Sequence, residues 1–365
     1  MRMKETLSLL LAAGMSLSLA ACGTAQVESS SASEPAASEA EPAQTAEQAA
    51  PAAEGAGEGT VYPVTLTDQA GREVTIESEP ETLVSGYYIS TSLLIALDLD
   101  EKLVGIEAKA DTRPLYQLSA PALLELPSVG TAKEFDLEGC AALEPDLVIL
   151  PLKLQDAADS LEELGITALV VNPEDQELLN EAATLIGTAT NTQARAGELL
   201  AFAQTQEARL GEVLAGVETP SVYLAGNSDF LSTAGDAMYQ SDMIRMAGGV
   251  NAAAEITDTY WAETSYEQVL AWDPEYIILA SDASYTVDDV LGDPNLAGCA
   301  AVESGNVYQI PGNAEAWDSP VPGGILGAVW LSGVLHPEEC PEADTMAVID
   351  EFYQTFYGFT YSEIG

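Results

Sequence analysis

One supersecondary pattern occurs twice in the chain and limits its fold more than any other feature. Glu138 is followed seven residues later by Pro145, then by an acidic residue and the apolar run Leu147–Leu150. Glu267 is followed at the same spacing by Pro274, an acidic residue and a second apolar run. The intervening residues have helical spacing, and proline ends a helix because it lacks an N–H group and clashes with the preceding turn. The sequence therefore predicts a short helix and a buried strand in each half, with a glutamate at each helix N-terminus.

These two glutamates have two interpretations. A carboxylate in the first turn of a helix interacts favourably with the helix dipole, by about 0.3–1 kcal/mol. In a chain with 59 acidic residues, such placement is common. The matched register in the two halves instead favours a shared functional role.

Short apolar runs alternate with helical stretches from residue 61 onward, which is typical of α/β folds with largely parallel strands. We expect a β-hairpin over Tyr62–Ile76. Strands are expected at Thr82–Ser85, Leu103–Glu107, Leu147–Leu150, Ala168–Val171, Ser221–Ala225, Tyr276–Ala280 and Val307–Ile310. Between the two groups of strands, helical spacing from Asn191 to Gly216 predicts one helix of roughly 35–40 Å.

The N-terminus has the pattern of a bacterial lipoprotein signal. Arg2 and Lys4 precede the apolar stretch Leu7–Leu19, and small residues lead to Cys22. This stretch is short for a membrane span, so we interpret residues 1–21 as a signal peptide and Cys22 as the lipidated residue. The alternative is an ordinary secretory signal with an incidental cysteine. Residues 22–60 carry few branched aliphatic residues and no aromatic ones, which predicts a flexible acidic linker.

Charge and rare residues exclude several function classes. The chain has 11 basic and 59 acidic residues and a net charge of −48, which argues against nucleic acid as a partner. One histidine, His336, excludes most zinc enzymes and histidine-rich metal receptors, and we expect no metal site and no cofactor. Cys140, Cys299 and Cys340 remain beside Cys22, with a Cys299–Cys340 bridge as an open alternative. The chain has no Gly-x-Ser-x-Gly elbow and no phosphate-binding glycine loop followed by lysine, so we do not expect an enzyme.

Several stretches together resemble one family. The repeat, the long helix, Leu126–Gly130, Met246–Asn251, and Trp330-Leu331 leading to Leu335–Glu338 are similar to the lipid-anchored solute-binding proteins of ABC importers for iron–siderophore, haem and cobalamin complexes. The resemblance covers nearly all of residues 61–365. It implies two Rossmann-like α/β lobes with central, mainly parallel sheets, joined by one long linking helix, with a ligand cleft between them. The boundaries would be 61–190, 191–217 and 218–365.

The resemblance also implies partners. In such proteins one glutamate on each lobe docks into arginines of the membrane permease, and the matching positions are Glu138 and Glu267. We therefore expect a monomer that is lipid-anchored on the extracytoplasmic face of the cell membrane and serves an ABC permease and its ATPase. His336 would lie in a structural element and not at the ligand. A binding lipoprotein that serves a sensor instead of a permease is an alternative.

Ligands of open α/β sheets bind beyond the carboxyl ends of the strands. The candidate ligand-binding residues that follow strands or precede the second repeat are Tyr87, Tyr88, Arg113, Lys153, Asn227, Asp229, Tyr260, Trp261 and Trp317. The aromatic residues suit a ring-bearing ligand. Arg113, with Lys153, would meet an anionic group. Arg113 precedes Pro114, and ordering its own loop is the alternative role.

The identity of the ligand stays open. An iron–siderophore, haem or corrinoid complex is the first expectation, and molybdate or tungstate is the alternative, because relatives in this family carry these oxyanions.

Overall fold

The predicted hairpin and strands are found in the computed structural model, which describes residues 59–257, 259 and 261–364. These residues all belong to one structural unit, Ala53–Gly365. The signal peptide 1–21, the lipidation site Cys22 and all of the linker except residues 59 and 60 lie outside the described residues, and so does Tyr260.

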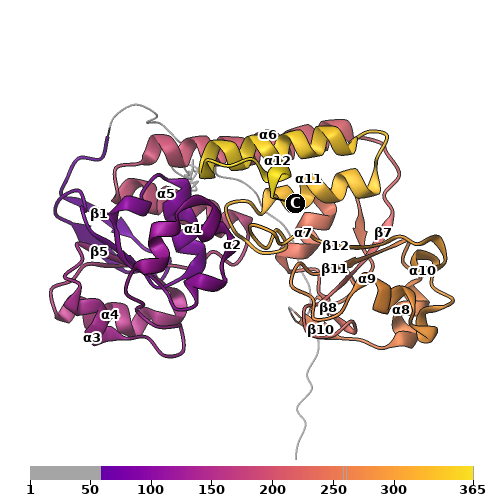
Figure 1. The fold of residues 1–365 in the computed structure, drawn as a ribbon, viewed down its shortest axis with the longest axis horizontal. Coiled ribbons are helices and arrows are strands. Elements are labelled where there is room, and N and C mark those ends of the chain that lie inside the picture. Colours follow the sequence, from indigo (N-terminus) through magenta and orange to yellow (C-terminus); the bar gives the residue numbers. More distant parts are fainter. Residues whose placement is uncertain (1–58, 258, 260, 365) are drawn as a thin grey trace, which may run out of the picture. The chain divides into compact units, whose positions relative to one another are not determined.

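Parallel strands form the first sheet, in the order β4-β3-β5-β6. Figure 1 shows strand β5 of this sheet in the indigo-to-magenta half of the chain. These strands are β3 (Leu83–Ser85), β4 (Leu103–Gly105), β5 (Leu147–Pro151) and β6 (Ala168–Val171). An antiparallel hairpin, β1 (Val64–Thr67) and β2 (Glu73–Ile76), precedes them. Every residue of β3, β5 and β6 is buried, as expected when helices cover both faces of a parallel sheet.

The second sheet contains both parallel and antiparallel strands. Its parallel strands are β7 (Ser221–Ala225), β9 (Val250–Asn251), β11 (Tyr276–Leu279) and β12 (Val307–Gln309). Antiparallel β8 (Ser232–Ala234) pairs with β7, and β10 (Trp261–Glu263) pairs with β8. The sequence did not predict β8, β9 or β10, because runs of two or three residues are too short to show alternation.

Helices follow most of the parallel strands. In the first half they are α1 (Tyr88–Ala96), α2 (Pro114–Ser119), α3 (Leu137–Ala142), α4 (Gln155–Glu163) and α5 (Gln176–Ala189). In the second half they are α7 (Tyr239–Met246), α8 (Tyr266–Trp272), α9 (Val287–Leu291), α10 (Ala300–Ser304), α11 (Ile325–Leu335) and α12 (Glu342–Tyr357).

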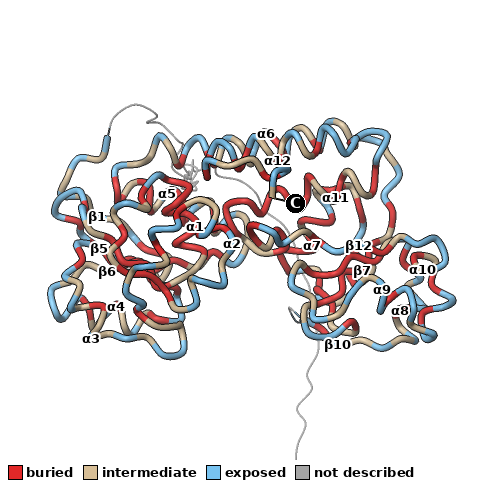
Figure 2. Tube along the Cα trace, viewed as in Figure 1, coloured by how far each residue is buried: buried red, intermediate tan, exposed pale blue. Residues whose placement is uncertain are grey.

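Alternate residues of each central strand point into different hydrophobic cores. On β5, Val148 and Leu150 pack with residues of α3 and α4, whereas Leu147 and Ile149 join a larger core. On β11, Ile277 and Leu279 form a separate core, and Ile278 joins the same larger core. This larger core includes residues from both halves of the chain. Figure 2 shows buried stretches, in red, in both halves. The two lobes therefore share one continuous apolar interior.

The predicted linking helix is α6 (Gln193–Val213), whose 21 residues span about 32 Å. It is shorter than expected because a turn begins after Val213, with Gly216 at a φ of 79°. It packs on α5 of the first half and on α7 and α11 of the second. A second connection was not predicted: α12 contacts α1, and the Tyr357 hydroxyl lies 3.3 Å from the Ser92 carbonyl oxygen.

The cysteines outside the signal region do not form a disulfide. Cys140, Cys299 and Cys340 are buried and free. The Cys299–Cys340 bridge that the sequence left open is therefore absent from this structure.

Candidate ligand-binding site

A cavity of about 290 Å³ lies where the first-half loops meet the loops after β11 and β12. The first half contributes Tyr88, Ser92, Thr112, Arg113, Pro114, Leu115 and Tyr116, and the second half contributes Ser281, Asp282, Gly312, Ala314, Glu315, Ala316 and Val321. Larger depressions, of about 570 and 670 Å³, lie beside α5 and α6. We consider the smaller cavity the better candidate because ligands of such folds bind at the carboxyl ends of parallel strands.

Local sequence explains how Tyr88 and Arg113 reach this cavity. Tyr88 is the first residue of α1, which starts directly after β3 and the Gly86-Tyr87 turn. Arg113 is the N-cap of α2, and Pro114 is favoured at the next position because its missing N–H is not needed there. The guanidinium carbon of Arg113 lies 4.2 Å from the centroid of the Tyr88 ring, so the ring stabilises the cation.

Arg113 differs from most other arginines among the described residues because it has no acidic partner. Arg72, Arg195 and Arg245 each form ion pairs with two or more carboxylates, and Arg113 forms none in this part of the chain. Its Nε atom is buried without a hydrogen-bond partner. A buried donor without a partner is costly. The positively charged Arg113 side chain therefore has an N–H donor available to an anionic group.

The opposite wall of the cavity is ordered by a buried carboxylate. Asp318 accepts a hydrogen bond from the Ser281 hydroxyl at 2.7 Å and another from the Ser281 amide at 3.1 Å. Burial raises the pKa of Asp318, and these hydrogen bonds from Ser281 act in the opposite direction. Asp318 thus fixes the loop after β11 and is not free to contact a ligand.

The structure brings together three of the predicted residues. Arg113 packs on Tyr88, and the Tyr87 ring lies 5.1 Å from the Tyr88 ring in an edge-on arrangement. Of these three, Tyr88 and Arg113 line the cavity, and Tyr87 lies outside its lining together with the remaining candidates that the structure describes. Lys153 is exposed on a 3-10 turn after β5, and Asp229 accepts a hydrogen bond from the Leu231 amide in its own loop.

Two further candidates lie at the edge of this region. The Asn227 amide donates to the carboxylate of Asp282, which lines the cavity. Trp261 is 40% exposed, and its ring lies against Gly226, where an added Cβ would be 3.0 Å from the indole. Both residues therefore lie close to the end of β7 and could contact a ligand larger than the cavity.

The prediction that Trp317 lies at the cleft is wrong. Trp317 is fully buried, its Nε1 donates to the Tyr353 hydroxyl at 2.8 Å, and its ring packs on Tyr361 at 5.0 Å. The chain turns inward after β12 because these C-terminal aromatic residues form a cluster there.

Sequence reasoning missed Glu315 and Tyr116 as cavity residues. A weak signal for Glu315 exists, since it is a single acidic residue among small and apolar neighbours after a predicted strand, and such an acid is often buried. Tyr116 lies on α2 after Arg113 and has no comparable signal.

The repeated unit has the same geometry in both lobes. Glu138 is the second residue of α3 and Glu267 is the second residue of α8, and both are exposed. The N-cap side chains are Asp136 and Ser265, each accepting a hydrogen bond from the backbone amide three residues later. These caps stabilise the first turn that presents each glutamate.

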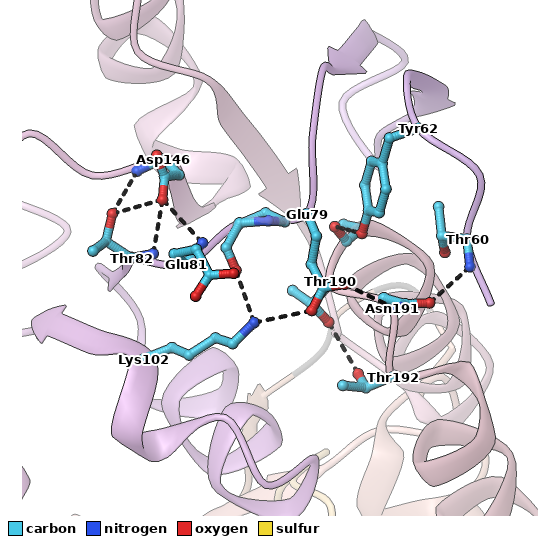
Figure 3. Close-up of polar contacts among 12 residues, drawn as sticks. Thr60, Tyr62, Glu79, Glu81, Thr82, Lys102, Asp146, Thr190, Asn191 and Thr192 are labelled. Atoms are coloured by element: carbon cyan, nitrogen blue, oxygen red, sulfur yellow. Dashed lines mark hydrogen bonds and ion pairs between the residues drawn. The ribbon is translucent and has the colours of Figure 1, made fainter.

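The acidic residue after each proline anchors the neighbouring strand. Asp146 accepts hydrogen bonds at 2.9 Å from the amides of Glu81 and Thr82 and from the Thr82 hydroxyl (Figure 3). Glu275 accepts a hydrogen bond at 2.9 Å from the Ser221 amide in the second lobe. The unit is thus duplicated in its side-chain contacts as well as its secondary structure.

Residues 83–314 match the model of the family described as periplasmic binding protein. The chain belongs to this family. It is 28% identical over 322 residues to the molybdate-binding protein MolA of Haemophilus influenzae, covering 81% of this chain and 91% of the relative. A cobalamin-binding protein of Halobacterium salinarum is 23% identical over 270 residues, covering 72% and 71%. The crystal structure of a periplasmic solute binding protein from Veillonella parvula superposes with a TM-score of 0.73 at 28% identity, covering 82% of this chain and 95% of that one.

This chain is thus a solute-binding protein of ABC importers, and its relatives are binding proteins, not enzymes. Within residues 59–257, 259 and 261–364, no group of three or more His, Cys, Asp or Glu side chains could hold a metal ion. In the same residues, no helix combines the length and apolar character needed to cross a membrane.

Proposed function

We propose that this protein captures a compact anion of the molybdate or tungstate class and delivers it to an ABC importer. The observation that carries the proposal is Arg113, which lies in the cavity with a buried, unpartnered Nε and no acidic partner among the described residues. In a chain of net charge −48, a cation left unpaired within a cleft favours an anionic ligand.

Cavity size supports a compact ligand. A volume of about 290 Å³ is at the lower limit of pockets that hold drug-sized molecules. A tetrahedral oxyanion fits within it, whereas a corrinoid or haem would extend beyond it. The similarity to a molybdate-binding protein over 91% of that relative's length agrees with this choice.

An anionic metal complex is the second candidate, either an iron–siderophore, haem or a corrinoid. The observation that favours it is the aromatic surface around Arg113, formed by Tyr87 and Tyr88, with the exposed Trp261 at the end of β7. The similarity to a cobalamin-binding protein supports the same candidate.

The proposal includes delivery to a partner in the membrane. Glu138 and Glu267 would dock into arginines of the permease, and a lipid on Cys22 would keep a monomeric protein near it, raising its effective concentration there. A protein that serves a sensor would keep the ligand site without needing these glutamates.

Titration of ligand affinity tests the function. Molybdate, tungstate, haem, a corrinoid and a ferric siderophore would each be titrated while tryptophan fluorescence is recorded. Arg113→Ala should weaken binding of the true ligand by roughly ten- to hundredfold, the value of a charge-assisted hydrogen bond. Lys133→Ala, which removes the same charge from an exposed turn, should leave the affinity unchanged. Equal affinities for the Arg113→Ala and Lys133→Ala proteins would contradict the proposal.

A further inference from the structure

The wall of the Arg113 cavity contains a buried carboxyl group that the proposed function does not yet use. Glu315 lines the cavity together with Arg113 and Ser92, although it is only 6% exposed. Among the described residues it forms no ion pair. An unpaired carboxylate this deeply buried would be costly, so its protonation state matters.

Glu315 lies among tyrosine hydroxyl groups of α12. The Trp317 Nε1–H can only donate, so the Tyr353 hydroxyl accepts it at 2.8 Å and gives its own proton to Glu315 Oε2 at 3.4 Å. The Tyr357 hydroxyl lies 3.3 Å from the Ser92 carbonyl oxygen, which can only accept. Glu315 Oε1 lies 3.4 Å from the same hydroxyl. The single Tyr357 proton can be donated to Ser92 or to Glu315 Oε1. Both contacts form together when Oε1 carries a proton and donates it to the Tyr357 oxygen.

The surroundings favour the neutral acid. The titratable and charged groups around Glu315 are Tyr353 and Tyr357 of α12, Tyr239 of α7, Arg113 and Tyr116 at α2, and Asp282 and Asp318 in the second-sheet loops. Burial raises the pKa of Glu315 to about 8, and the hydrogen bonds that its ionised form would accept from Tyr357 and Tyr353 oppose this without overcoming it.

We propose that the anionic ligand binds while Glu315 is protonated, so that the cavity holds the anion together with one proton on its wall. This inference rests on the anion-binding function proposed above. The neutral acid leaves the charge of Arg113 uncompensated. Loss of the proton would place a negative charge in the cavity and would draw the Tyr357 hydroxyl from Ser92, the contact between α12 and α1.

The first test needs no ligand. In protein labelled with ¹³C at glutamate carboxyl groups, one resonance should titrate near pH 8, and it should disappear in the Glu315→Gln protein. Glu107→Gln is the matched control. Glu107 is also buried and accepts hydrogen bonds from the Thr91 and Tyr116 hydroxyls, but it lies outside the cavity lining. The Glu315 resonance should remain in that variant. A Glu315 resonance that titrates near pH 4–5 would overturn the proposal.

The second test uses the same probes, molybdate, tungstate, haem and a ferric siderophore, at pH 6.5 and pH 9.5. Wild-type affinity for the probe that binds should fall roughly thirtyfold across this range, as proton linkage predicts for a group titrating near pH 8. The Glu315→Gln protein should show a change of less than about threefold. Equal pH dependence in both proteins would overturn the proposal. If no probe binds the wild type at either pH, the function proposed above fails, while the carboxyl titration still decides whether Glu315 holds the proton.

Tyr357→Phe provides a second variant should Glu315→Gln fold poorly. Without the hydroxyl that accepts the Glu315 proton, the neutral acid loses a hydrogen bond, so the titration midpoint of the Glu315 resonance should fall. An unchanged or raised midpoint would contradict the hydrogen-bond assignment.

Discussion

At the scale of single residues, Glu315 should make the stability of the protein depend on pH in a definite direction. The pKa of Glu315 rises from an ordinary value of 4.5 to about 8 because of burial. Between these values the folded state holds a proton that the unfolded state has released, so stability falls as pH rises, by about 1.4 kcal/mol per pH unit. This contribution is complete below pH 4.5 and lost above pH 8.

The Glu315→Gln protein should therefore lose less stability than the wild type between pH 5 and pH 8. Urea unfolding at several pH values measures this difference directly. Burial also raises the pKa values of Glu107 and Asp318, so both proteins keep some pH dependence and the comparison concerns the difference in slope. Parallel stability curves would show that Glu315 is ionised in the folded protein.

Sequence alone predicted Tyr88 and Arg113 as candidates, and both line the cavity, because both follow strands and the carboxyl ends of parallel strands fix where such residues lie. The same reasoning misplaced Trp317, because the position of a residue after a strand does not indicate which other side chains pack against it. The residues that bury Trp317 are Tyr353 and Tyr361, more than thirty positions later in the chain. Such long-range packing has no local signal.

At the scale of elements, the duplicated unit was predictable because it uses local rules alone. A helix cap, a proline and an apolar run are each visible within about fifteen residues. The structure adds one detail that sequence did not reveal. Glu144 and Asp273, which precede the two prolines, both adopt positive φ values, 49° and 46°. Their shared left-handed conformation directs the chain from each short helix into its strand.

Gly130 should be the most sensitive glycine near this unit. Its φ is 87°, and an added Cβ would lie 2.1 Å from the Glu134 carbonyl oxygen and 3.1 Å from the Asp136 amide. The turn at Gly130 leads into Asp136, the N-cap of α3, so the strain would reach the helix that carries Glu138. Gly130→Ala should lower the free energy of unfolding by about 2–4 kcal/mol.

Gly165→Ala is the matched control for this prediction. Gly165 has a similar φ of 82°, but an added Cβ would meet no atom within 4 Å. That variant should lose only about 1 kcal/mol, from the left-handed conformation itself. Thermal or urea unfolding compares the two proteins, and equal losses would mean that backbone conformation alone, without the clash, determines the cost.

At the scale of the whole molecule, α6 and the contact of α12 with α1 join the two lobes through one continuous core. Helical periodicity revealed α6 in advance. The α12 contact could not be predicted, because pairing a C-terminal helix with an element more than two hundred residues earlier depends on tertiary packing. The short antiparallel strands β8 and β10 were missed because their pairing is likewise set by neighbours and not by their own sequence.

Charge reversal at the exposed residues Glu138 and Glu267 tests the proposed delivery of the solute to a permease. Reversing both charges to lysine should reduce solute uptake by cells more than tenfold, because two ion pairs with the permease would become repulsive, while ligand affinity of the purified protein should not change. Reversal of Glu207 and Glu212, both exposed on α6, controls for the change in net charge. Undiminished uptake by the Glu138 and Glu267 variant would favour a sensor as the partner.

Anion binding at Arg113 is central to the proposed function, and a crystal of the full chain soaked in tungstate tests it most directly. X-ray data collected at the tungsten absorption edge locate the metal atom independently of any fitted ligand. We predict one strong anomalous peak beside the Arg113 guanidinium, between Tyr88 and Ser281. A peak elsewhere in the molecule, or no peak at a tungstate concentration that saturates a related oxyanion receptor, would contradict the account.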